Sequence, residues 1–478
     1  MERLRSRGAD PDAWVVGSGP NGLAGAVELA RNGFDVTVLE AAGDIGGGTR
    51  TSELVVPGVL HDHCSAVHPM ATASPFMKSL DLERHGLEWC WPEIDLAHPL
   101  DDGTAGVMVR SIDQTAGWLG SDGGAWRAQF ERPSATFESL LPDLMGPMVH
   151  LPRRPIRLTR FGIRALASAT MSARAWHTEQ AKALFGGVAA HAISPLTKPL
   201  SSSVGRALIC SCHAFGWPVA RGGSHSITKA LAAELKEHGG KIETGREVRS
   251  LDELPPSEVV LLDLAPARAA DVAGARLNAK VARAYRRYRH GPAAYKVDFA
   301  VKGGVPWTNG ACRRAGTVHA VGTFDETVAA EAEISRGRMP ENPFVLVGQQ
   351  YLADPSRSSG DIHPIWAYAH VPSRWANNET EAVIRQIERF APGFRKRIVA
   401  QVSMSPAEFE SYNSNFIGGD IIGGANSPLQ IVSRPRFRLN PYATGIPGVY
   451  LCSASTPPGA GAHGMGGYNA ARAALKAL

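Results

Sequence analysis

The chain has 478 residues, more than one ordinary hydrophobic core accommodates, so two or three domains are expected. Its 44% hydrophobic and 20% charged residues are typical of a globular protein, and a net charge of +5 without an extended Lys/Arg tract argues against nucleic-acid binding. No run of about 18 apolar residues occurs, so no transmembrane helix is predicted.

The first twelve residues contain three arginines but no apolar run of the secretory type, so no signal peptide is predicted. The six cysteines form no CxxC pair and have no regular spacing, which favours a reducing, cytoplasmic compartment over a disulfide framework. Cys210 and Cys212 are interpreted as two packed thiols on an extended segment rather than as a redox pair.

Residues 13–50, AWVVGSGPNGLAGAVELARNGFDVTVLEAAGDIGGGTR, are the most informative stretch. A short apolar strand is followed directly by the turn GSGPNG at 17–22, then by a helical pattern and by a second strand that ends on Glu40. An acid 18 residues after the last turn glycine, Gly22, completes the arrangement of a dinucleotide-binding unit.

Each turn glycine has a physical role in such a unit. Gly17 permits the tight turn, Gly19 lets a pyrophosphate approach the backbone, and Gly22 lets the helix lie close to the strand. The helix N-terminus supplies unpaired N–H groups and a partial positive charge. Glu40 can accept hydrogen bonds from a ribose diol.

Two loops after this unit contain residues suited to ligand contacts. Residues 46–50, GGGTR, suit close approach to a phosphate with Arg50 as a donor, and a plain flexible loop is the alternative. Residues 60–70 hold His61, His63 and His68, whose spacing matches no standard metal pattern. We therefore predict no metal site and expect this loop to line a cofactor or substrate cleft.

The middle of the chain contains a basic amphipathic stretch. Six arginines and no acid lie between Asp143 and Glu179, and those from Arg153 to Arg164 alternate with apolar residues. This pattern is compatible with peripheral contact with an anionic membrane. The alternative is a solvated helix face that covers the substrate domain.

The later sequence returns to an α/β pattern. A helix from about 224, strand pieces at 241–244 and 247–248, and a buried strand at 259–264 are predicted. The run 295–301, YKVDFAV, alternates in the manner of a half-exposed antiparallel strand. At the end, a strand at 449–453, a glycine-rich loop and a helix at 469–478 form a second strand–loop–helix unit.

The glycine unit at 13–50 and the C-terminal YLCSAST and PPGAGAHGMGGYNAA resemble those of FAD-dependent phytoene-desaturase-like oxidoreductases. HDHCSAVHP, ARGGSHSITKAL, YKVDFAV, IERFAPGF and NSNFIGGDIIGG are similar to the branch that includes pyridine nucleotide-disulphide oxidoreductase domain-containing protein 2. The resemblance implies an α/β fold with a glutathione-reductase-type Rossmann FAD-binding domain and an inserted α+β substrate domain. Expected boundaries are 12–75, 216–270 and 400–478 for the first domain, and 76–215 and 271–399 for the second.

The resemblance also implies the cofactor, FAD, and its contacts. Gly17, Gly19, Asn21 and Gly22 would hold the pyrophosphate, Glu40 the adenosine ribose, and Val248 the adenine through its backbone. Gly47, Gly48 and Arg50 would lie by the phosphates, and Ala462, His463, Gly464 and Met465 at the flavin ring. The remaining predicted cofactor contacts are Pro20, Ala41, Thr49 and Ser453.

The leading functional hypothesis is desaturation of a largely apolar small-molecule substrate by removal of a hydride and a proton. His463 and His63 are the candidate catalytic groups, and a structural role is the alternative for each. The sequence has no second complete GxGxxG domain for NAD(P)H, so oxygen, a quinone or another acceptor is expected to re-oxidise FAD.

Two other functions stay open. One is amine oxidation, for which the chain offers tryptophans at 217, 307, 366 and 375 as a potential aromatic cage. The other is a partner-binding or membrane-binding protein whose FAD is structural. The oligomeric state is not predicted.

Overall fold

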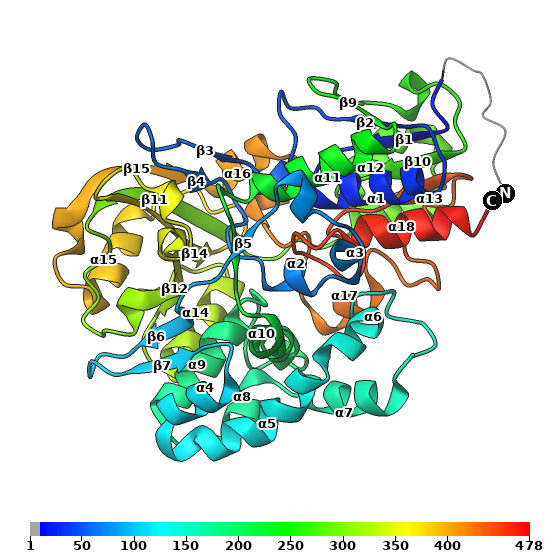
Figure 1. Ribbon diagram of the computed structural model, residues 1–478. Coiled ribbons are helices and arrows are strands. Elements are labelled where there is room, and N and C mark those ends of the chain that lie inside the picture. The colour runs from blue at the N-terminus through cyan, green and yellow to red at the C-terminus, as the bar shows by residue number, and fades with distance from the viewer. Residues whose placement is uncertain (1–9) are drawn as a thin grey trace.

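The computed structural model describes residues 10–478 and contains two sheets that organise the chain (Figure 1). The first is a five-stranded parallel sheet in the order β16-β10-β1-β2-β9. Its strands come from three distant parts of the chain: β1 (Ala13–Val16), β2 (Val36–Leu39), β9 (Lys241–Glu243), β10 (Val259–Leu262) and β16 (Val449–Leu451).

Helices cover both faces of this sheet, as expected for strands that are apolar throughout. Alternate residues of β1 point to opposite faces, so Val15 packs in one core and Trp14 in another. One core contains α1 (Pro20–Arg31), α11 (His225–Glu237) and α18 (Met465–Leu475), and the other contains α12 (Pro266–Ala273) and α13 (Ala279–Arg286).

The second sheet has seven strands in the order β15-β11-β14-β13-β12-β6-β7 and is antiparallel except for the pair β12–β6. It is built from β6 (Ile94–Pro99), β7 (Ala105–Met108), β11 (Ala293–Lys302), β12 (Ala315–Ala320), β13 (Val345–Gly348), β14 (Ile362–Val371) and β15 (Ile398–Met404). α14 (Phe324–Ser335) contacts β14, and α15 (Thr380–Phe390) packs on the face opposite the first domain.

A helical layer completes the substrate domain (Figure 1). It consists of α4 (Ile112–Trp118), α5 (Gly123–Ala135), α6 (Leu141–Leu144), α7 (Pro155–Ala165), α8 (Ala169–Ala173), α9 (Glu179–Ala190) and α10 (Ser201–Phe215). The short elements are α2 (Pro69–Ala73), α3 (Pro75–Lys78), α16 (Pro406–Tyr412) and α17 (Pro428–Ser433), with the strand pairs β3 (Thr51–Ser52)–β4 (His61–Asp62) and β5 (Trp89–Cys90)–β8 (Val219–Ala220).

The predicted architecture, a Rossmann-type domain with an inserted α+β domain, is confirmed, and several local predictions are corrected. Cys210 and Cys212 lie on helix α10, not on an extended segment, and both are buried. Residues 247–248 form no strand. Strand β11 is buried on both sides except at Lys302, rather than half exposed.

Two elements cross the expected domain boundaries. Strand β15 runs past residue 400 and pairs with β11 in the seven-stranded sheet. Helix α13 packs against the parallel sheet, although the prediction gave residues after 270 to the substrate domain. No helix within residues 10–478 combines the length and apolar character that crossing a membrane requires.

Candidate cofactor and substrate site

A cavity of about 1220 Å³ is lined by residues of both sheets. This exceeds the roughly 300–1,000 Å³ of common small-molecule pockets, so it has room for a dinucleotide and a further molecule. Of the seventeen predicted cofactor residues, fourteen line it; the other three, Gly22, Gly464 and Met465, lie directly behind its wall. The predicted cofactor residues therefore lie close together around one cavity.

The first glycine turn has the backbone geometry of an anion site. Gly17 has a φ of +102°, and a Cβ on Gly22 would stand 2.0 Å from the Gly17 carbonyl oxygen, so the turn tolerates no side chain there. Helix α1 begins at Pro20 without a side-chain cap on Gly19. Within the described chain the N–H groups of Gly19 and Asn21 donate to no protein acceptor. They are free to bind a diphosphate.

Asp263, which the sequence analysis did not single out, lies against this turn at the end of β10. Its Oδ2 accepts from the Gly22 N–H at 2.9 Å and would be 2.8 Å from a Cβ on Gly19. Burial, with a further contribution from the Glu40 charge, raises the pKa of Asp263 to about 7. A neutral carboxyl fits beside a diphosphate, whereas an ionised one repels it.

Glu40 stands at the end of β2, as the Rossmann pattern predicts. Its Oε2 accepts from the Ser18 N–H at 2.9 Å and the Ser18 hydroxyl at 2.6 Å, and its Oε1 from the Ala42 N–H at 2.9 Å. Arg50 donates to the same carboxylate at 3.3 Å and to the Asp44 carbonyl at 2.7 Å. The carboxylate thus ties together the loops that surround the predicted adenosine site.

The two glycine units of the chain meet at the start of α1 and α18. The Gly466 N–H donates to the Asn21 Oδ1 at 3.2 Å, and a Cβ on Gly25 would be 3.2 Å from the Gly467 carbonyl oxygen. Helix α18 starts at Met465, four residues before the predicted start, so its N-terminus also faces this junction. The residues present therefore fit FAD held by both ends of the chain.

The predicted catalytic histidines have different surroundings. His463 lines the cavity, its Nδ1 accepts from the Met465 N–H at 3.1 Å, and burial lowers its pKa to about 4. The neutral ring is thus held by the loop backbone. His63 lies outside the cavity wall; its Nε2 bonds the Ser52 hydroxyl at 2.8 Å, and its pKa is also lowered to about 4, mainly by burial.

The other histidines of this loop do not converge on a metal. His61 bonds the Phe299 carbonyl and His68 the Ser224 hydroxyl. Among the described residues, one group of three potential ligands exists, His85 with Glu234 and Glu237. Arg84 contacts both of those carboxylates and neutralises part of their charge.

The substrate half of the cavity is built on one face of the seven-stranded sheet. Cross-strand pairing places Lys296 beside Tyr368 and Asp298 beside Trp366. The Lys296 ammonium contacts the Asp298 carboxylate and lies 5.9 Å from the Trp366 ring centroid. Burial raises the pKa of Asp298, and the Lys296 charge opposes that shift. Thr317 and other cavity residues complete this wall.

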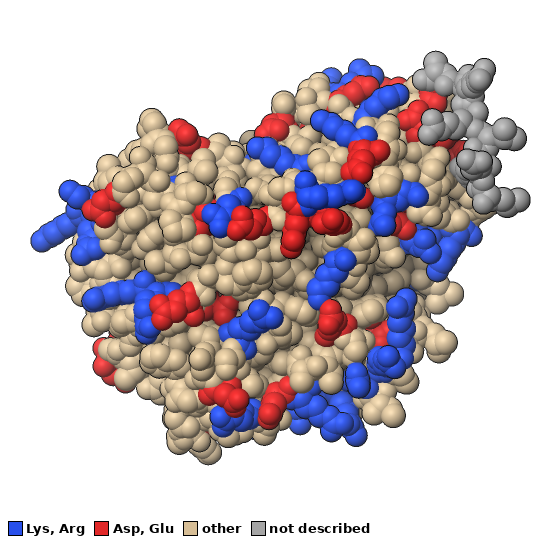
Figure 2. Space-filling view, viewed as in Figure 1, with Lys and Arg blue, Asp and Glu red and all other residues tan. Residues whose placement is uncertain are grey.

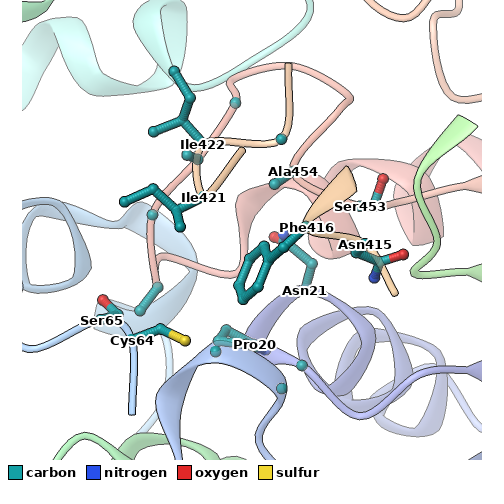
Figure 3. Close-up of a pocket in the computed structure, with 18 of the residues that line it drawn as sticks. Pro20, Asn21, Cys64, Ser65, Asn415, Phe416, Ile421, Ile422, Ser453 and Ala454 are labelled. Atoms are coloured by element: carbon teal, nitrogen blue, oxygen red, sulfur yellow. The ribbon is translucent and has the colours of Figure 1, made fainter. Parts of the chain in front are cut away.

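Apolar side chains next to this sheet face also line the cavity (Figure 3). Phe416 points its ring into the cavity near Pro20 and Cys64, and Ile421 and Ile422 project beside it (Figure 3). Of the four tryptophans considered for an aromatic cage, Trp217 and Trp366 line the cavity, whereas the ones at 307 and 375 do not.

A chain of histidines leads away from the cavity. His191 lines it, and its Nε2 lies 3.0 Å from the Nε2 of His319, which is fully buried. The Nδ1 atoms of His319 and His98 have no partner within the described protein and lie 2.5 and 2.6 Å from the position of a Cβ on Gly187. Burial lowers the pKa of His191 to about 3. The sequence offered no signal for this cluster, because its members come from separate elements.

The fold and the site together define a protein with a Rossmann dinucleotide-binding domain and a second domain that completes the cavity. Residues 15–80 match the model of the NAD(P)-binding Rossmann-like domain. The chain is homologous to mouse pyridine nucleotide-disulfide oxidoreductase domain-containing protein 2, being 24% identical to it over 572 residues that cover 98% of this chain and 94% of that one.

Solved structures share the fold over almost the whole chain. A triple mutant of putrescine oxidase, from a redesign of its cofactor binding, superposes with a TM-score of 0.63 at 15% identity and covers 98% of both chains. A fatty acid isomerase from P. acnes that produces CLA gives a TM-score of 0.56 at 14% identity, covering 98% of this chain and 99% of that one. FAD is therefore the cofactor that the Rossmann domain and the residues of the site indicate.

Proposed function

We propose that the protein uses FAD to desaturate a largely apolar organic substrate. The distribution of charge in the cavity carries this proposal. Among the described residues that line it, the four acids, Glu40, Glu247, Asp263 and Asp271, all belong to the FAD-binding side. The substrate half offers apolar and aromatic walls and two cations, those of Lys296 and Arg434. An ammonium substrate would find no counter-charge there, whereas an apolar chain would be well accommodated.

When bound, FAD supplies the acceptor for the hydride that desaturation removes. The chain must then orient the substrate and accept a proton. The wall formed by Tyr368 and Trp366 provides a flat apolar surface for orientation. His463 is the group proposed to accept the proton, and it is neutral near pH 7 because burial lowers its pKa to about 4. The Lys296 ammonium, which is paired with Asp298, is proposed to position the substrate.

The experiment is anaerobic incubation of the purified yellow protein with a panel of polyenes, unsaturated fatty acids and amines. Loss of flavin absorbance with an apolar compound, and not with an amine, is the expected outcome. Bleaching by amines alone would replace the proposal with amine oxidation. No bleaching by any organic compound, while dithionite still reduces the flavin, would favour a structural FAD.

The role of His463 needs a separate test. His463→Ala should retain FAD and lose most of its turnover if the histidine handles the proton. Unchanged turnover with unchanged flavin binding would leave it a structural role, the Met465 contact. His63→Ala is the matched comparison, because His63 lies outside the cavity wall and its loss should affect turnover less.

Amine oxidation is the second candidate. Trp366 and Tyr368 both line the cavity, and their rings meet edge to face with centroids 5.1 Å apart. The likeness to putrescine oxidase is one of fold, and it supports this alternative only in that sense. We also propose a reducing, cytoplasmic location, which is supported by all six cysteines being unpaired.

A further inference from the structure

Exposed apolar side chains are concentrated at one end of the cavity. Among the described residues, eleven of the sixteen exposed large apolar side chains belong to residues 148–171 and 429–439, which we call the rim. Leu151 is 93% exposed, Leu439 80%, Leu429 79% and Phe437 77%. Single exposed apolar residues are normal on any protein, but a group of this size marks an interaction surface.

Helix α7 shows how the rim is constructed. Phe161 and Ala165 are buried and fix the helix to the substrate domain. Ile156 and Ile163, seven residues apart and therefore on one face, are 69% and 66% exposed. The helix thus has two apolar faces, and only one of them is covered by the protein.

The rim is also basic. Five arginines lie between residues 153 and 164, and the sequence has no acid between Asp143 and Glu179 or after Asp420. Within the described chain, none of these five arginines forms an ion pair. In Figure 2 blue side chains gather at the lower right, where α7 lies in Figure 1. Arg438 adds a further exposed charge beside Phe437.

The cavity reaches the surface at the rim. Met148, Phe161 and Ile431 line its apolar end, and Met148 is at the same time 47% exposed. Residues of both rim segments therefore surround the same opening. A substrate that enters here passes between them.

We propose that the rim docks on an anionic lipid bilayer, with its apolar side chains in the headgroup boundary and its arginines on lipid phosphates. Exposed apolar residues between unpaired arginines are the composition of an interfacial helix, and the positive charge complements an anionic surface. An apolar substrate could then pass from the lipid directly into the cavity. The docking rests on this surface alone; only the entry of substrate rests on the proposed function.

The test is co-sedimentation of the holoprotein with vesicles of phosphatidylcholine alone or with 30% phosphatidylserine, at about 50 and 500 mM NaCl, since salt screens charge over shorter distances as it rises. Binding to the anionic vesicles, weakened by salt, is expected. Arg160→Glu with Arg164→Glu should lower the partition coefficient at least about 30-fold, because each basic residue near such a surface contributes about fivefold.

Apolar insertion is tested by Ile156→Ser with Ile163→Ser, which should reduce binding by about tenfold. Matched controls are Lys229→Glu with Lys236→Glu on α11, and Val399→Ser with Val402→Ser on β15, exposed positions away from the rim. Each control should bind as the unmodified protein does.

Absence of salt-sensitive binding to anionic vesicles by the unmodified protein would overturn the proposal. So would rim variants that bind as tightly as their controls, and this result would point instead to a protein partner or a different surface. Because vesicle binding is measured without any substrate, a failure of the proposed desaturation would leave this result unaffected.

Discussion

The buried carboxyl of Asp263 predicts that FAD binding weakens as the pH rises above about 7. Its pKa is raised to about 7, mainly by burial, and it lies against the turn that receives the diphosphate. The added negative charge of the cofactor raises this pKa further, so the bound state keeps the proton. Above pH 7 the protein must therefore take up a proton when FAD binds.

The size of the effect follows from the pKa. At about pH 8.5, roughly 1.5 units above it, proton uptake costs about 2 kcal/mol, because one unit corresponds to about 1.4 kcal/mol. The Kd for FAD should thus be about 30-fold higher than at pH 6. The Kd is measured at both pH values by titrating the apoprotein with FAD and following the quenching of flavin fluorescence.

Asp263→Asn is the matched variant, because its amide oxygen can still accept from the Gly22 N–H. The Kd of this variant for FAD should be nearly independent of pH between about 6 and 8.5. A variant whose Kd for FAD has the same pH dependence as that of the unmodified protein would refute the reasoning.

Unfolding of the apoprotein gives a second readout. The pKa of Asp263 is raised from 3.8 to about 7 in the folded state, so this carboxyl stabilises the folded protein fully below about pH 4. The contribution is lost as the pH rises to about 7. The variant should therefore gain stability relative to the unmodified protein at pH 8.

Three further variants test the site. Lys296→Met should lower the free energy of unfolding by about 3–5 kcal/mol, because it leaves Asp298 buried and unpaired. Adding Asp298→Leu should restore stability, measured by urea melts, but should not restore turnover. Gly22→Ala should abolish FAD retention, since its Cβ has no room, while Gly43→Ala, with open space around it, should retain the flavin on gel filtration. Glu40→Ala should lower Tm and raise the Kd for FAD at least about tenfold through loss of several hydrogen bonds of about 1 kcal/mol each; an unchanged Kd would remove it from the site.

The dinucleotide site was accessible from the sequence because its requirements are local. Gly17, Gly19 and Glu40 owe their roles to chain geometry within about 25 residues, and the same holds for the loop before His463. That local pattern does not predict a role for Asp263. It becomes part of the site only because β10 pairs with β1, which is a long-range event.

The substrate half shows where pattern reasoning fails. Lys296 and Asp298 gave β11 an alternation that predicted one solvent-exposed face. In the structure β11 lies between β14 and β15, and the two charges neutralise one another at the cavity. Alternation reports which residues share a face but does not reveal whether that face meets water or a ligand.

The meeting of the two glycine units also bears on how the protein is made. The contact between Asn21 and Gly466 spans 445 residues, and strand β16 and helix α18 complete the parallel sheet and its cover. At about 5–20 residues per second, the ribosome needs roughly 20–90 s to bridge that interval. Throughout this time the N-terminal turn is exposed without its partner. We therefore expect nascent chains to depend on chaperones, and chains truncated before α18 to emerge without flavin and to be degraded.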